Sequence, residues 1–186
     1  ITLALRHVHA RRIVHRDVKA ANVFLTKKGV AKLGDFGVSR QLDVTGGATQ
    51  LASTRIGTPY YLAPEIFEGK PYGRSADVWS LGVVLYELCA LQPPFTANNL
   101  VALAKTIKAG AFEPLGDHYS SLLKEVVSMC LRVDGRARPT VQKLVQVCED
   151  RRSGATVTLG EKAYESPPAS PAKPPPKPAT PPPKPV

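Results

Sequence analysis

The most informative residues of the chain are His15-Arg16-Asp17-Val18-Lys19-Ala20-Ala21-Asn22. Thirteen residues after Asn22 comes Asp35-Phe36-Gly37, and Ala63-Pro64-Glu65 follows later in the chain. Five fixed residues in a window of eight occur by chance in about one window per million. Three such motifs in this order therefore indicate one shared site.

These motifs resemble the catalytic-loop, metal-binding and activation-segment signatures of protein kinases. Phosphoryl transfer needs a carboxylate that orients the attacking hydroxyl, and Asp17 has that chemistry. The cation of Lys19 can reach the transferring phosphate, while Asn22 and Asp35 offer the oxygen ligands that Mg²⁺ prefers. We expect Asp17 and Lys19 to be catalytic, and Asn22 and Asp35 to bind magnesium and ATP. The contrary hypothesis, that both aspartates are ordinary loop acids, leaves the joint occurrence of the motifs unexplained.

The first part of the chain predicts a short helix, a hairpin and a loop. Ile1, Leu5 and Val8 have helical spacing. Residues 23–33 are short apolar runs around a Lys-Lys-Gly turn, which predicts a hairpin. Residues 38–58 lack periodicity, so we expect a long loop there.

The second part predicts a group of helices. Residues 75–91 are apolar on nearly every side, which is typical of a helix buried in the middle of its domain. Two amphipathic segments follow, at 100–107 and 122–130. A last helix begins with Thr140 as its N-cap and has its core-facing positions at Val141, Leu144, Val145 and Cys148. The pattern predicts an α+β fold, mostly helical.

Composition separates the end of the chain from the rest. Of 186 residues and a net charge of +10, the segment from Arg151 onward carries a net +4 and 11 of the 18 prolines. Such a segment cannot bury enough apolar surface to offset the entropy of ordering. We therefore expect a folded domain over residues 1–150 and a disordered, basic, Pro-rich tail over 151–186. No apolar run approaches the roughly 20 residues that cross a membrane, so no membrane association is expected.

The cysteines and most histidines do not suggest a metal site. Cys89, Cys130 and Cys148 lack paired ligand spacing, and they predict buried thiols in a reducing compartment rather than a disulfide or zinc site. His7, His9 and His118 also lack ligand spacing, and we expect them at helix surfaces or caps.

Further residues resemble the NIMA-related (Nek) serine/threonine kinases, although Ste20-like and other families share parts of the pattern. The similar runs are Ile56-Gly57-Thr58-Pro59-Tyr60-Tyr61-Leu62-Ala63-Pro64-Glu65, Asn-Val-Phe-Leu-Thr-Lys-Lys-Gly from Asn22, and Tyr86-Glu87-Leu88-Cys89. Over residues 1–150 the chain is similar to the C-terminal lobe of such a kinase. The resemblance implies a kinase that uses ATP and Mg²⁺ to phosphorylate Ser or Thr in protein substrates.

The resemblance also implies roles for individual residues. Thr58 would contact Asp17 and Lys19 and mark specificity for Ser and Thr, and Phe24 would lie under the adenine. The supports that it implies are Asp77 as an anchor of the catalytic loop, Glu65 paired with Arg138, and His15 with Phe36 in a hydrophobic spine.

An activating phosphate is implied on Thr54, with Arg16 and Arg40 around it. Ser53 and Thr49 are neighbouring alternatives for the modified residue. An unmodified loop threonine is the remaining alternative.

Two nucleotide-binding motifs of protein kinases do not occur in the sequence: a Gly-x-Gly-x-x-Gly loop and a Val-Ala-x-Lys strand. The first residue is Ile rather than Met, so we expect a cut or a truncated gene model. On its own the chain is expected to have no appreciable kinase activity. The alternative is a natural non-catalytic C-lobe that binds partners, although such a module does not need metal ligands.

Partners of the tail are suggested by its composition. Pro168-Ala-Ser-Pro171-Ala-Lys173 fits the Pro-x-x-Pro-x-basic pattern that SH3-type grooves bind, with an inert spacer as the alternative. The positive charge suits acidic surfaces such as tubulin. Nothing resembles a nucleic-acid-binding fold, so nucleic acid is not expected. A cytoplasmic location with cytoskeletal association is implied by the family resemblance alone.

Overall fold

The computed structural model describes residues 1–37, 40–41, 59–70 and 72–154, with residues 40–41 described by their backbone only. The helices are α1 (Thr2–Ala10), α2 (Pro64–Phe67), α3 (Arg74–Ala90), α4 (Leu100–Ala109), α5 (Ser121–Cys130) and α6 (Val141–Arg152). The strands are β1 (Ile13–Val14), β2 (Val23–Leu25), β3 (Ala31–Leu33) and β4 (Arg40–Gln41). This content confirms the predicted α+β, mostly helical fold.

The strands form two small antiparallel pairs. Strands β2 and β3 make the predicted hairpin, with Val23 opposite Leu33. Strand β4 pairs with β1 and places Arg40 opposite Val14. The prediction of an unbroken loop over 38–58 is therefore wrong at residues 40–41, because their pairing partner lies far away in the sequence. The remainder of 38–58 lies outside the described residues.

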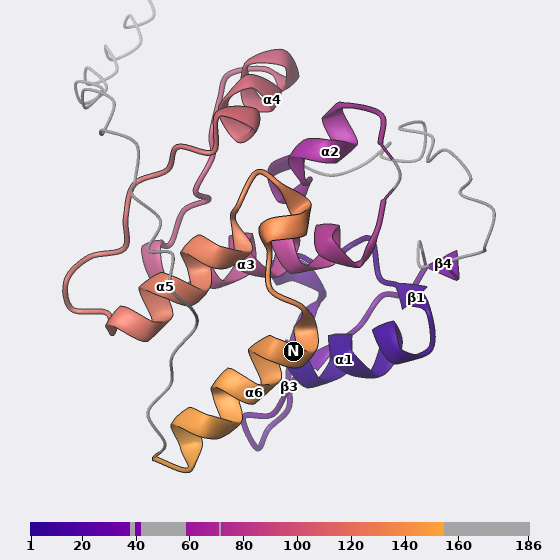
Figure 1. The fold of residues 1–186 in the computed structure, drawn as a ribbon, viewed down its shortest axis with the longest axis vertical. Coiled ribbons are helices and arrows are strands. Elements are labelled where there is room, and N and C mark those ends of the chain that lie inside the picture. The colour runs from indigo at the N-terminus through magenta and orange to yellow at the C-terminus, as the bar shows by residue number, and fades with distance from the viewer. Residues whose placement is uncertain (38–39, 42–58, 71, 155–186) are drawn as a thin grey trace, which may run out of the picture.

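Helix α3 is the centre of the fold, as the apolar run over 75–91 predicted. Trp79 and Val83 pack into one buried cluster, while Val78 and Leu81 pack into a second cluster on another side of the helix. The indole of Trp79 stacks on Phe95 with ring centroids 5.4 Å apart. Figure 1 shows α5 lying alongside α3. A helix with a core on two sides has little freedom to shift.

The close approach of α3 and α5 depends on Gly82. A Cβ atom on Gly82 would lie 2.6 Å from Cys130 Cβ and 3.0 Å from Leu131 Cδ2. Glycine within a helix costs about 1 kcal/mol relative to alanine. Here it is needed because no side chain fits between the two helices.

Helix α6 packs across α1, and here two expectations need correction (Figure 1). Cys148 was expected in the core, but it is exposed and Val147 is buried in its place. The buried residues of α6 are Val141, Leu144, Val145 and Val147. The helix also runs through Arg152, past the expected domain boundary at 150. The positive charges of its last-turn arginines interact favourably with the negative end of the helix dipole. Residues 155–186 of the predicted tail lie outside the described part.

The three thiols differ in their surroundings. All three cysteines are free, and only Cys130 is fully buried. Burial raises the pKa of the Cys130 thiol to about 12. The expectation of uniformly buried thiols is therefore wrong for Cys148 and holds only in part for Cys89, which is half-buried. Among the described residues, no helix is both long and apolar enough to span a membrane.

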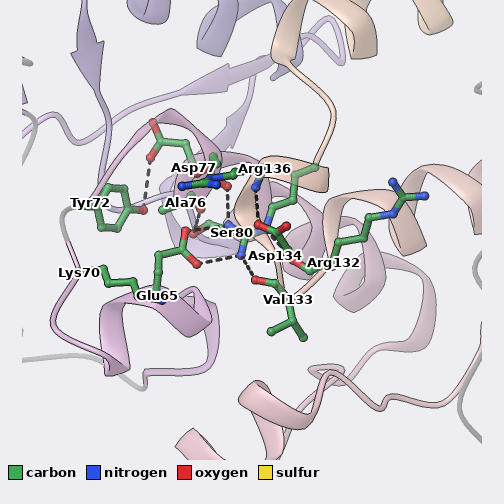
Figure 2. A network of polar contacts seen from close by, with 12 residues as sticks. Glu65, Lys70, Tyr72, Ala76, Asp77, Ser80, Arg132, Val133, Asp134 and Arg136 are labelled. Atoms are coloured by element: carbon green, nitrogen blue, oxygen red, sulfur yellow. Dashed lines mark hydrogen bonds and ion pairs between the residues drawn. The ribbon is translucent and has the colours of Figure 1, made fainter.

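Glu65 in α2 and Arg138 after α5 form an ion pair with two parallel contacts, each 2.8 Å long. The buried guanidinium also donates to the backbone carbonyls of Arg132, Ser75 and Val133 and lies 5.0 Å from the centre of the Trp79 ring. Figure 2 shows Glu65 and Val133 at this junction. Every donor direction of the guanidinium is thus used to join α2, α3 and the segment before α6.

Gly82→Ala should lower the free energy of unfolding by about 1–3 kcal/mol, the cost of overpacking, although alanine is the better helix former. Chemical denaturation of the 186-residue chain measures the effect. The control is Gly73→Ser at the extended N-cap of α3, where a Cβ meets nothing within 4 Å. That change should stay within about 0.5 kcal/mol of the parent. A Gly82→Ala protein as stable as the parent would contradict the close packing.

Arg138→Ala should lower the free energy of unfolding by about 3–5 kcal/mol, because it leaves the Glu65 carboxylate without its charge partner. The control is Arg136→Ala, which removes an exposed arginine from the same segment and should cost less than about 0.5 kcal/mol. Equal losses in the two variants would show that the ion pair does not stabilise this junction.

Candidate functional site

The loop between β1 and β2 places the first motif in one cluster. The Lys19 ammonium lies 2.6 Å from Asp17 Oδ2, and Asn22 Nδ2 donates to the same oxygen at 2.9 Å and to the Asp17 carbonyl at 2.8 Å. The side chains of Asp17 and Lys19 are 29% and 28% exposed, so both remain accessible from solvent. The loop therefore presents an oriented carboxylate and a neighbouring cation at its surface.

His15 fixes the base of this loop. Its ring is fully buried, and Nε2 donates to the carbonyl of Gly34 at 3.1 Å. The backbone N–H of Asp17 donates to Nδ1 at 3.3 Å. Because one ring nitrogen donates and the other accepts, the imidazole is in its neutral Nε2–H form. His15 thereby ties Asp17 to the β2–β3 hairpin.

The hairpin brings the second motif beside Asn22. The N–H of Gly34 donates to the Asn22 carbonyl at 3.0 Å, and Asp35 follows directly in a left-handed backbone conformation, φ 58°. A Cβ on Gly34 would lie 2.7 Å from the Phe24 ring, so the ring rests on this glycine. Asp35 Oδ1 accepts a bond from the Gly37 N–H at 3.2 Å. Asn22, Phe24 and Asp35 are thus gathered at one end of the hairpin.

The donor set at this end fits a magnesium ion. The Asn22 amide directs its nitrogen to Asp17, so its oxygen can act as a ligand, and Asp35 adds a carboxylate. The described residues contain no group of three or more His, Cys, Asp or Glu that could hold a metal. Magnesium does not require such a group, because it commonly takes one or two protein oxygens together with phosphates and water.

Asp77 of α3 connects the loop to the core. Its fully buried carboxylate accepts backbone bonds from the N–H groups of His15 and Arg16, each at 2.9 Å. The Tyr72 hydroxyl donates to it at 3.3 Å (Figure 2). Burial, and then the charge of Asp77, raise the pKa of Tyr72 well above its ordinary value. Arg16 has a left-handed backbone conformation, φ 70°, and the backbone bonds of His15 and Arg16 to Asp77 stabilise it.

His9 is the residue that sequence reasoning missed. It was expected at a helix surface, but its side chain is only 2% exposed and its Nε2 donates to Asp77 Oδ2 at 2.8 Å. The available signal was its position one helical turn after Leu5, which puts both residues on the buried side of α1. No local pattern indicated Asp77, 68 residues away, as the partner of His9.

The structure places some of the remaining predicted site residues. The rings of His15 and Phe36 make an edge contact with centroids 4.6 Å apart, and the Arg16 guanidinium lies 5.7 Å from the centre of the Tyr72 ring. Thr54 and Thr58 lie outside the described residues, and only the backbone of Arg40 is described.

Tyr61, shortly after the undescribed residues 42–58, is bound to α3 through both its hydroxyl and its backbone carbonyl. Its hydroxyl donates to Glu87 Oε2 at 2.5 Å, and Ser80 Oγ donates to its carbonyl at 2.8 Å. Burial and the bond to Glu87 raise the pKa of Tyr61 to about 12, so the phenol stays protonated and keeps donating. The segment leading to Ala63-Pro64-Glu65 is therefore anchored to the same helix as the loop that carries Asp17 and Lys19.

Comparison with known proteins agrees with this geometry. The family model described as "Protein kinase domain" matches residues 1–148. The chain is 49% identical over 146 residues to "Serine/threonine-protein kinase Nek1" of Mus musculus, and 48% identical over 147 residues to "Serine/threonine-protein kinase Nek5" of Homo sapiens. Each match covers 78% of this chain, but only 12% of the mouse protein and 20% of the human one.

A third relative comes from a distant organism. "Putative serine/threonine-protein kinase A" of Trypanosoma brucei brucei is 48% identical over 147 residues, 79% of this chain and 34% of that protein. The chain thus spans about a third or less of the length of these three relatives. The chain belongs to the protein kinase family and is similar to its NIMA-related (Nek) members.

Proposed function

We propose that this protein is a serine/threonine kinase that transfers the γ-phosphoryl group of ATP to Ser or Thr hydroxyls of protein substrates. The observation that carries the proposal is the convergence of Lys19 and Asn22 on the Asp17 carboxylate, with Asp35 beside Asn22. A partner-binding lobe without catalysis has no use for this arrangement.

Asp17 would act on the attacking hydroxyl. Within the described residues both side-chain bonds of Asp17 go to Oδ2, which leaves Oδ1 to accept a bond from a substrate hydroxyl. This bond would orient the hydroxyl oxygen toward the phosphorus and provide an acceptor for its proton. Such positioning is the main task in phosphoryl transfer, because the transition state needs little covalent help.

Lys19 and the proposed magnesium ligands would neutralise the negative charge of the phosphate groups. The Lys19 ammonium can turn from Asp17 to the transferring phosphoryl group over a short distance, since it is partly exposed and already within 2.6 Å of the carboxylate. Protein kinases use ATP with Mg²⁺, and the metal neutralises charge that develops on the phosphate oxygens. Asn22 and Asp35 would hold the ion, and the exposed ring of Phe24 would lie under the adenine.

Regulation and partners are proposed from the sequence. A phosphate on Thr54 would pair with Arg16 and Arg40 and order the segment before Tyr61. Mass spectrometry of the active protein tests for this phosphate.

The tail would bind an SH3-type or acidic surface, which a peptide array tests. A cytoplasmic, cytoskeleton-associated location is part of the same proposal, and imaging of a fluorescent fusion checks it.

Asp17→Asn should reduce phosphoryl transfer by about 10²–10⁴-fold, because the amide can no longer accept the hydroxyl proton. The assay fuses residues 1–186 behind a protein-kinase ATP-binding lobe that carries the Gly-x-Gly-x-x-Gly loop and the Val-Ala-x-Lys strand, and it measures transfer from labelled ATP to a protein substrate. The control is Asp117→Asn, a matched change at an exposed aspartate. A fusion that is active and unaffected by Asp17→Asn would contradict the assigned role, and the unfused chain should show no transfer.

His9→Leu should lower kcat of the same fusion by about tenfold, since Asp77 loses a buried donor and the catalytic loop loses part of its anchor. KM for ATP should change little, because the His9 side chain bonds to Asp77 and not to the residues proposed to hold ATP. His9→Gln, which keeps an N–H donor, should recover part of kcat, and exposed His7→Gln is the matched control. Equal loss of kcat in the Leu and Gln variants would contradict the positioning role of the bond to Asp77.

A further inference from the structure

The positive charge of the folded part is concentrated at its start. Residues 1–41 contain nine Lys or Arg and only two acids, Asp17 and Asp35. Residues 42–150 contain ten Lys or Arg and eleven Asp or Glu. The excess charge before the tail therefore comes entirely from the first 41 residues.

Part of this charge lies on exposed residues of α1 and of the turn after it. Arg6, His7, Arg11 and Arg12 are all exposed, and we call them the α1 basic face. The opposite side of the helix is buried and holds Leu5, Val8 and His9. Residues 1–16 include no Asp or Glu at all. The helix thus has a core side and a cationic outer side.

The central guanidinium of this face is held in place by its own helix. Arg11 Nη1 donates to the His7 carbonyl at 3.2 Å and contacts His7 Nδ1 at 3.1 Å. Because a guanidinium has donors only, Nδ1 must accept, and the His7 ring is neutral in this contact. Neither partner cancels the charge of Arg11. The side chain has lost part of its freedom before any ligand arrives, which lowers the entropic cost of binding.

The neighbouring helix α6 does not neutralise the α1 basic face. Glu149 Oε1 lies 4.0 Å from Arg6 Nη1, and both side chains are about half exposed, so this contact is weak in water. Asp150 accepts a bond from Gln146 of its own helix. The last turn of α6 adds exposed Arg151 and Arg152. Cations near a helix C-terminus also interact favourably with the helix dipole. That interaction requires only that they lie in the last turn, and it leaves their charge facing solvent.

We propose that the α1 basic face is a docking site for an Asp/Glu-rich segment of a partner protein. Arginine forks bind carboxylates through two parallel bonds, and all three strong cations of this face are arginines. The described residues of α1 and β1 include no Phe, Tyr or Trp, the large aromatic side chains on which nucleic-acid bases stack. Leu3 is the single exposed large apolar side chain on α1, which is too little to insert into a membrane. The site does not depend on phosphoryl transfer.

The test measures binding of a fluorescein-labelled Glu-rich peptide to the 186-residue chain by anisotropy, at low ionic strength and near 0.15 M. The triple variant Arg6→Gln, Arg11→Gln, Arg12→Gln is compared with Lys105→Gln, Lys108→Gln, Arg136→Gln, which removes the same charge from exposed residues elsewhere. Both proteins keep the same tail. Thermal unfolding of each variant confirms that the fold is retained.

The α1 variant is expected to bind the peptide at least about fivefold more weakly, with a smaller dependence on salt, while the control stays within about twofold. Equal weakening in both variants would overturn the proposal, because net charge alone would then explain binding. Binding of a single-stranded oligonucleotide or of anionic vesicles through the α1 basic face, without binding of the peptide, would also overturn it. Replacing the three arginines by lysine should recover only part of the affinity, because lysine cannot form the two parallel bonds of a guanidinium.

Discussion

The buried carboxylate of Asp77 is the interaction on which the candidate site depends. It accepts bonds from the backbone of His15 and Arg16, from His9 in α1 and from the Tyr72 hydroxyl. A carboxylate without donors in such a place would cost several kcal/mol, so these groups must stay where they are. The loop that carries Asp17 and Lys19 is therefore fixed by the requirement to satisfy one buried charge.

That charge is itself held by the helix with the most extensive packing. Helix α3 lies between two buried clusters, approaches α5 closely at Gly82, and is joined to α2 through the contacts of Arg138 with Glu65 and with the Ser75 carbonyl. Tyr61 is tied to the same helix through Glu87 and Ser80. The loop that carries Asp17 and Lys19 and the segment before α2 thus share one rigid support. This suits a reaction in which placement of the reacting groups matters more than their intrinsic reactivity.

Helix α1 has a different task on each side. Its inner side supplies His9 to Asp77, and its outer side carries the α1 basic face. The two sides are separated by the thickness of one helix. A partner bound to the outer side would therefore lie on the opposite side of the helix from the bond between His9 and Asp77.

Local patterns were sufficient for much of this protein. Spacing and composition predicted the motif from His15 to Asn22, the hairpin around Lys27-Lys28-Gly29 and the apolar run of α3. Each of these features depends on neighbouring residues. The burial of His9, the exposure of Cys148 and the pairing of β4 with β1 could not be obtained in this way. Each of them depends on which distant segment packs against a given side of an element. Short-range periodicity carries no information about that choice, because it is made when the helices assemble around α3.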